Sequence, residues 1–182
     1  MKKENVKNLV LSSMFFCLGL VLPFLTGQIP KIGNMLLPMH IPVLLCGLIC
    51  GWRYGGVVGF FLPTVRSLIF GMPVFFPNAV GMAFELLTYG ILSGLIFGKS
   101  RRHNILSLYF SLAVTVVCGR LVWATAQVIM LGLGEDGFSF ALFVTKGFVN
   151  AFPGLILQFI LIPTIMMIFK KATPTLKATE SK

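Results

Sequence analysis

Six apolar segments, separated by glycine, proline and charged residues, constrain this 182-residue chain more than any other feature. They cover residues 8–25, 40–50, 54–70, 78–97, 105–131 and 140–169. Only 11% of the residues are charged, whereas a soluble globular domain carries about 25%. A domain of this size cannot hide 57% apolar residues from water, so its apolar solvent must be lipid. The sequence predicts one all-α membrane domain, residues 1–182, with six transmembrane helices.

Two of these segments are short for a spanning helix, which needs about 20 residues. The second segment, 40–50, is clearly short, and the third, 54–70, is marginal. Glycines between them, around Trp52 and Arg53, favour a tight helical hairpin. Small residues also recur four positions apart, which predicts close helix packing. These residues are Gly47/Gly51, Gly55/Gly59 and Gly90/Gly94/Gly98.

Basic residues are distributed unevenly among the connections. With a cytoplasmic N-terminus, eleven of them fall on the cytoplasmic side, and Lys31 falls in an external loop. The eleven are Lys2, Lys3, Lys7, Arg53, Lys99, Arg101, Arg102, Lys170, Lys171, Lys177 and Lys182. Cytoplasmic loops of membrane proteins carry an excess of Lys and Arg. Both termini are therefore predicted to be cytoplasmic.

Four charged residues remain inside predicted spans: Arg66, Glu85, Arg120 and Lys146. Each costs a few kcal/mol at the bilayer centre, so each should face protein or a wet cavity. With the predicted orientation, the intramembrane polar residues lie in the outer half or near the middle, and only Gln158 falls toward the inner half. They predict a polar cup that opens to the outside.

Helical spacing places several polar residues on common faces. Arg120, Trp123 and Gln127 follow at i, i+3 and i+7, a single stripe of a helix. Similar stripes are expected on the fourth and sixth segments. The candidate substrate-binding residues are Arg66, Asn78, Glu85, Tyr89, Arg120, Trp123, Gln127, Lys146 and Asn150. Pro63 and Pro153-Gly154 are expected to break or kink helices beside this cup.

Structural roles are open for each of these residues. Arg66 and Glu85 could form an ion pair that only ties two helices together. Trp123 could belong to the interfacial aromatic belt, and Lys146 could extend to the outer surface. Gln127 and Asn150 could form hydrogen bonds between helices. For His40, at the first external loop, ordinary solvation is expected.

The charges inside the predicted cup sum to +2, which suits an anionic or carboxylate-bearing molecule. The aromatic rings of Trp123 or Tyr89 could cover an apolar portion of it. The first external loop, residues 26–39, is long, apolar and punctuated by glycine and proline, as expected of a lid. The alternative is a loop that lies on the lipid headgroups.

Motifs of the common enzyme classes are absent from the sequence, including Walker, GxSxG, HExxH and CxxC patterns. No paired intramembrane carboxylates are available for general acid–base or metal chemistry. Cys46 and Cys50 are spaced i, i+4, but no acidic residue lies near them in sequence, so a metal site is not expected. The sequence predicts neither an enzyme nor a bound cofactor, and any energy source should lie in another protein.

Several stretches give the chain a recognisable pattern. They are residues 37–55 (LPMHIPVLLCGLICGWRYG), residues 66–73 (RSLIFGMP), Pro77, and residues 82–85 (MAFE). Together with six short spans, cytoplasmic termini and a long first external loop, they resemble the S components of energy-coupling factor (ECF) vitamin transporters. The resemblance covers nearly the whole chain.

The resemblance implies a mechanism and partners. S components bind a vitamin or its precursor with high affinity near the outer surface, in the bacterial plasma membrane. They associate with a membrane scaffold subunit and two cytoplasmic ATPases, which hydrolyse ATP. Their first helix usually presents an Ala-x-x-x-Ala face to the scaffold, and the nearest match here is Ser13-x-x-x-Cys17.

For the substrate, the charge of the predicted cup favours pantothenate, whose carboxylate could meet Lys146 or Arg120. Hydroxymethylpyrimidine or pyridoxine could instead stack on Trp123 and bind Glu85. Two other functions stay open. In a membrane-embedded enzyme acting on lipid headgroups, Arg66, Arg120 and Lys146 would hold phosphate. A small proton-coupled transporter would use Glu85 and would work without partners.

Overall fold

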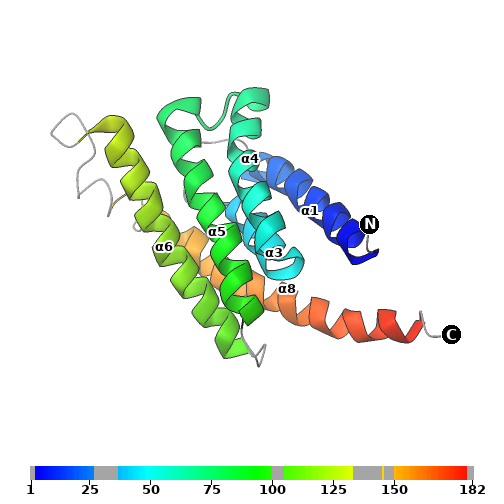
Figure 1. The fold of residues 1–182 in the computed structure, drawn as a ribbon. Helices are drawn as coiled ribbons and strands as arrows, with labels where there is room; N and C mark the ends of the chain where they lie inside the picture. The colour runs from blue at the N-terminus through cyan, green and yellow to red at the C-terminus, as the bar shows by residue number, and fades with distance from the viewer. Residues whose placement is uncertain (1–2, 27–36, 100–104, 133–144, 146–149, 180–182) are drawn as a thin grey trace.

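The computed structural model describes residues 3–26, 37–99, 105–132, 145 and 150–179, and these residues fold into a helical bundle (Figure 1). The elements in chain order are α1 (Lys3–Val21), η1 (Leu22–Thr26), α3 (His40–Cys50), α4 (Trp52–Phe70), η2 (Phe75–Ala79), α5 (Val80–Lys99), α6 (Ile105–Leu131) and α8 (Phe152–Thr179). Six of these described elements are α-helices. The all-α class predicted from the sequence is confirmed.

Four helical stretches are long and apolar enough to cross a membrane. They are Asn5–Phe24, Phe75–Lys99, Ile105–Leu131 and Phe152–Phe169. The helix α3 has only 11 residues, too few to span a bilayer alone. The helix α4 has 19 residues but is not among the four, because Arg53, Arg66 and Pro63 lower its hydropathy. Length and hydropathy thus support a multi-pass membrane protein and four of the six predicted spans.

The last helix differs most from its sequence prediction. It runs from Phe152 to Thr179 instead of over 140–169, and Asn150 and Ala151 form a turn before it. Pro153 is its second residue, where the missing N–H has no intrahelical acceptor and the fixed φ favours helix initiation. Pro153 therefore lies at the start of α8, directly after the turn, where a break or a kink was expected from the sequence.

The entry to α5 is also irregular. Phe76, within η2, has extended backbone angles (φ −115°, ψ 133°), so the regular helix begins only at Val80. Asn78 consequently lies in η2, before the regular helix that carries Glu85. Asn78 is exposed whereas Glu85 is buried, so the outer end of the polar stripe predicted on the fourth segment does not lie with Glu85 in the interior.

The hairpin between α3 and α4 is as tight as the glycines predicted. Gly51 alone separates the two helices, with φ at +93°, a region that favours glycine. Beyond the turn the backbones approach closely. A Cβ on Gly55 would lie 2.6 Å from the Cα of Gly47 and 2.7 Å from the carbonyl oxygen of Gly90 in α5. These glycines let three helices meet backbone to backbone.

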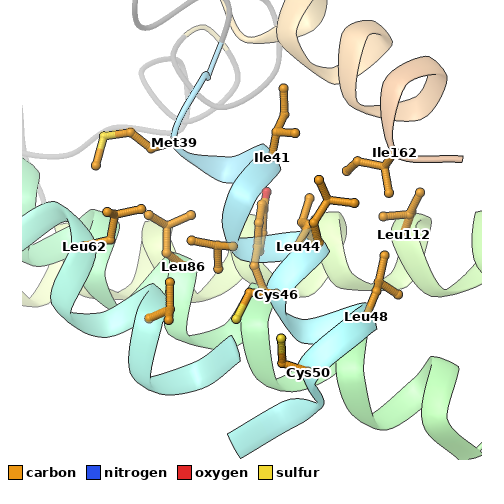
Figure 2. Packing of buried hydrophobic residues seen from close by; sticks show 14 of the residues in the cluster. Met39, Ile41, Leu44, Cys46, Leu48, Cys50, Leu62, Leu86, Leu112 and Ile162 are labelled. Carbon is orange, nitrogen blue, oxygen red and sulfur yellow. The ribbon is translucent and has the colours of Figure 1, made fainter. Parts of the chain in front are cut away.

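The helix α5 packs against α3, α4 and α6, while α8 packs against α3 and α6 (Figure 1). The short helix α3 is buried along almost its whole length and supplies much of the apolar core. Figure 2 shows Ile41, Leu44 and Leu48 of α3 beside core residues from the neighbouring helices. Since α3 is surrounded, any polar side chain on it must find its partners inside the protein.

Candidate functional site

One stripe of α5 faces one stripe of α6 over four successive helical turns. The contacts are Gly81 with Trp123 and Gln127, Glu85 with Arg120, Tyr89 with the space left by Gly119, and Ser93 with Ser111. The α5 residues are four positions apart, and their partners run backward along α6, as two antiparallel helices require. This contact brings together five of the nine residues predicted from the sequence: Glu85, Tyr89, Arg120, Trp123 and Gln127.

The centre of this contact is a buried ion pair. Arg120 Nη1 lies 3.0 Å from Glu85 Oε1, and His40 Nε2 lies 3.5 Å from the same oxygen. Glu85 and His40 are 1% exposed, and Arg120 is 4% exposed. A buried carboxylate is costly unless it is paired, so Arg120 accounts for the placement of Glu85, and His40 lies beside the same oxygen.

Tyr89 packs against this charged cluster from the next turn of α5. Its ring meets the His40 imidazole edge to face, with 5.3 Å between ring centroids and an interplanar angle of 69°. The ring fits because Gly119 has no side chain, and a Cβ there would overlap it. Gly119 therefore allows α5 and α6 to enclose the phenol next to the ion pair.

Only part of the Arg120 guanidinium has a partner in the described structure. Its Nη1 faces Glu85, whereas Nε and Nη2 are buried and have no hydrogen-bond partner among the described residues. Nε and Nη2 form one edge of the planar guanidinium, and this edge matches two acceptor oxygens such as those of a carboxylate. Arg120 thus offers two parallel hydrogen-bond donors, Nε and Nη2, inside the bundle.

Arg66 lies elsewhere, although the sequence placed it with Arg120. Its Nη1 donates to the carbonyl oxygen of Leu20 at 2.6 Å, near the C-terminal end of α1. Its guanidinium carbon lies 5.2 Å from the ring centroid of Phe24 and 5.4 Å from that of Phe70. The alternative in which Arg66 pairs with Glu85 is therefore wrong, because the partner of Glu85 is Arg120.

The remaining predicted residues divide by position. Trp123 and Gln127 are buried against Gly81, one turn from Glu85. Asn78 and Asn150 are exposed in the described structure. Lys146 lies outside the described residues. The described cluster is enclosed, and the outward-facing cup stays a prediction.

His40 is the site residue that sequence reasoning missed. We expected solvation because it adjoins a predicted external loop. One signal pointed the other way: the ten residues after His40 are all apolar or glycine, which leaves that helix no polar face to turn toward water. A histidine at the start of such a helix is carried into the core with it.

The residues predicted to meet a scaffold, Ser13 and Cys17, lie on the outer surface of α1. They line a shallow apolar groove of about 650 Å³ along this helix, and a second groove of about 450 Å³ between α1 and α4. The Ser13 hydroxyl donates to the carbonyl oxygen of Leu9 in its own helix at 2.9 Å, so it needs no external partner.

The fold and the site define a multi-pass helical membrane protein. It has a buried charged cluster, in which the Nε–Nη2 edge of Arg120 has no partner among the described residues. The chain can be placed more narrowly, because residues 7–166 match the family of ECF transporter substrate-specific components. The chain belongs to this family. No curated protein and no solved structure gives a significant match. Members of the family are substrate-binding transporter subunits, so the lipid-headgroup enzyme loses its support.

Proposed function

We propose that this protein is the high-affinity binding subunit of an ECF-type importer in a bacterial plasma membrane, and that its substrate is a water-soluble vitamin or precursor. In this proposal both termini are cytoplasmic and the site opens to the outside. A membrane scaffold subunit and two cytoplasmic ATPase subunits drive transport. Family membership supports the class of function, and the distribution of basic residues supports the orientation.

The observation that carries the substrate assignment is the free Nε–Nη2 edge of Arg120. Placing an arginine in a low-dielectric interior is costly, and leaving two of its nitrogens unpartnered adds to that cost. A substrate carboxylate would satisfy both nitrogens at once. Pantothenate carries such a carboxylate and is our first candidate, while pyridoxine and hydroxymethylpyrimidine are the next.

The structure changes the reason for this choice. The sequence argument summed four intramembrane charges to +2, but Arg66 is engaged with α1 and Glu85 faces Arg120 directly. What now favours an acceptor-rich substrate is the directional donor edge. In the proposed site Glu85, Tyr89 and Arg120 hold the polar part of the substrate, and Trp123 and Gln127 lie toward its outer end. Asn78, Lys146 and Asn150 would complete the mouth of the site.

The test is to purify the protein from vitamin-rich culture and to identify co-purifying small molecules by mass spectrometry. Calorimetry with pantothenate, pyridoxine and hydroxymethylpyrimidine should then give one binding site with a micromolar or lower Kd for one of them. Recovery of a lipid alone, with no binding of the three at micromolar concentration, would contradict the proposal. Uptake by this chain without partner subunits would instead support the proton-coupled alternative.

A further inference from the structure

Three buried polar side chains that do not belong to the set predicted from the sequence carry atoms without a hydrogen-bond partner among the described residues. They are His40 of α3, Thr115 of α6 and Gln158 of α8, each at most 1% exposed. His40 Nδ1, Thr115 Oγ1 and both amide atoms of Gln158 have no hydrogen-bond partner among the described residues. Buried polar groups are nearly always satisfied, so a cluster of unsatisfied ones requires a reason.

Core packing sets the depth of these residues. One core residue from each of the three helices belongs to the same hydrophobic core cluster, here called the reference layer (Figure 2). These residues are Leu44, Leu112 and Ile162. The part of α8 before Ile162 lies toward the Met39–Ile41 end of α3 in Figure 2. His40 and Gln158 each precede their layer residue by four positions, and Thr115 follows its own by three. All three therefore lie one helical turn from the reference layer, on the same side of it.

The direction of the side chains follows from burial. Among the described elements α8 makes its main contacts with α3 and α6, which makes these two helices the expected neighbours of the buried Gln158. Thr115 lies one turn from Gly119, where the ring of Tyr89 is enclosed. The three residues thus extend the polar interior around Arg120, and His40 also contacts Glu85 and Tyr89 directly.

We propose that His40, Thr115 and Gln158 form an inner subsite for an uncharged polar group of the substrate, a hydroxyl or an amide. This inference rests on the proposed binding function. An imidazole, a hydroxyl and a primary amide each offer a donor and an acceptor, so together they suit a group that does both. Thr115 lies five residues from Arg120, so their Cα atoms are about 7.5 Å apart along the helix axis and their side chains leave the helix about 140° apart. The substrate therefore carries an acceptor pair for Arg120 and a separate hydroxyl or amide for the inner subsite.

Near-isosteric variants test the subsite, since Thr115→Val and Gln158→Met remove polarity while keeping side-chain size. In lipid nanodiscs, whichever of pantothenate, pyridoxine and hydroxymethylpyrimidine binds the wild type should bind each variant about tenfold more weakly. Thr125→Val on α6 and Thr164→Val on α8 are matched controls, because both hydroxyls are exposed and bond within their own helix. These controls should leave the Kd unchanged.

Melting without added vitamin separates this role from a structural one. If the polar groups serve the substrate, the vitamin-free Thr115→Val and Gln158→Met proteins should melt at or above the wild-type temperature. Unchanged vitamin affinity in both variants would overturn the subsite, and so would a lower vitamin-free melting temperature. If the wild-type protein bound none of the three vitamins, the proposed substrate class would be wrong. The subsite would still be tested, because a lower melting temperature of Gln158→Met would overturn it.

Discussion

Two buried arginines, Arg66 and Arg120, show two ways of keeping a cation inside a membrane protein. Both are less than 5% exposed, and both come from predicted spans. Arg66 bonds to the carbonyl oxygen of Leu20 and lies against two phenylalanine rings. Arg120 faces Glu85 through one nitrogen and keeps its Nε–Nη2 edge unpartnered among the described residues.

The partners of Arg66 explain its role. The last carbonyls of a helix have no intrahelical donor, and the C-terminal end of the helix attracts positive charge. By bonding to Leu20 near the end of α1, Arg66 fixes that helix to α4. Its neighbours Phe24 and Phe70 cover the guanidinium with their rings. A residue with these partners supports the fold, whereas Arg120 has donors left for another molecule.

The largest expected effect is the loss of the buried carboxylate. Glu85→Ala leaves Arg120 unpaired in the interior and should lower the free energy of unfolding by about 3–5 kcal/mol. The same variant should lose vitamin binding. Unfolding monitored in detergent or nanodiscs measures the first effect, and calorimetry measures the second.

The control replaces both charges. In the Glu85→Leu/Arg120→Met double variant no buried charge is left without a partner, so most of the lost stability should return. Vitamin binding should stay absent, because the donor edge is gone. If the single variant cost less than 1 kcal/mol, the ion pair would not be the stabilising contact described here.

The second prediction compares the two arginines directly through lysine substitutions. Arg120→Lys keeps a positive charge beside Glu85 but removes the planar two-nitrogen edge, so vitamin affinity should fall about 10- to 100-fold. Arg66→Lys removes the ring stacking and weakens the bond to Leu20. It should cost about 1–2 kcal/mol of stability and leave vitamin affinity within about twofold.

Melting temperature and Kd measured on the same samples distinguish the two variants. The comparison fails if Arg66→Lys weakens vitamin binding as much as Arg120→Lys does. That outcome would return Arg66 to the substrate site, where the sequence first placed it.

A third, smaller effect concerns the space that Tyr89 occupies beside Arg120. Gly119→Ala puts a methyl group against the Tyr89 ring, and such overpacking should cost about 1–3 kcal/mol. Because the ring also contacts His40, its displacement should weaken vitamin binding. Gly98→Ala is a suitable control, since a Cβ there meets nothing within 4 Å. Equal melting temperatures and affinities for the two variants would show that the ring has room to move.

Sequence reasoning did well where the local pattern decides the structure. α3 and α6 span the same residues as the second and fifth apolar segments. The stripe of Arg120, Trp123 and Gln127 is buried on one face of α6, because a 3.6-residue period fixes which side chains share a face. The single-residue hairpin at Gly51 also follows from local chemistry.

It failed where the outcome depends on how helices meet. The sequence gives the depth of Arg66 but not its direction, and the Leu20 carbonyl becomes available only because α1 ends beside α4. His40 was expected to be solvated, yet the packing of α3 buries it. The sequence indicated that Pro153 would interrupt a helix. It did not indicate that Pro153 would stand at the start of α8, because that depends on the position of the turn at Asn150 and Ala151.

The smallest effect on the isolated protein is expected far from Arg120, on the outer face of α1. Leucine at Ser13 or Cys17 would add bulk to the shallow apolar groove along α1, where both side chains are exposed, so stability and vitamin affinity should change by less than about 0.5 kcal/mol. If this face meets the proposed scaffold subunit, added bulk should weaken co-purification with that subunit about tenfold or more.

Thr125→Leu adds similar bulk to an exposed position on α6 and should leave assembly intact. Equal loss of assembly in both variants would mean that the scaffold does not distinguish α1 from other lipid-facing helices, and no loss in either would place the contact on another surface. Arg66 holds the end of α1, so Arg66→Lys should loosen this helix without altering its outer face. This variant should therefore impair assembly less than the leucine variants at Ser13 and Cys17 do.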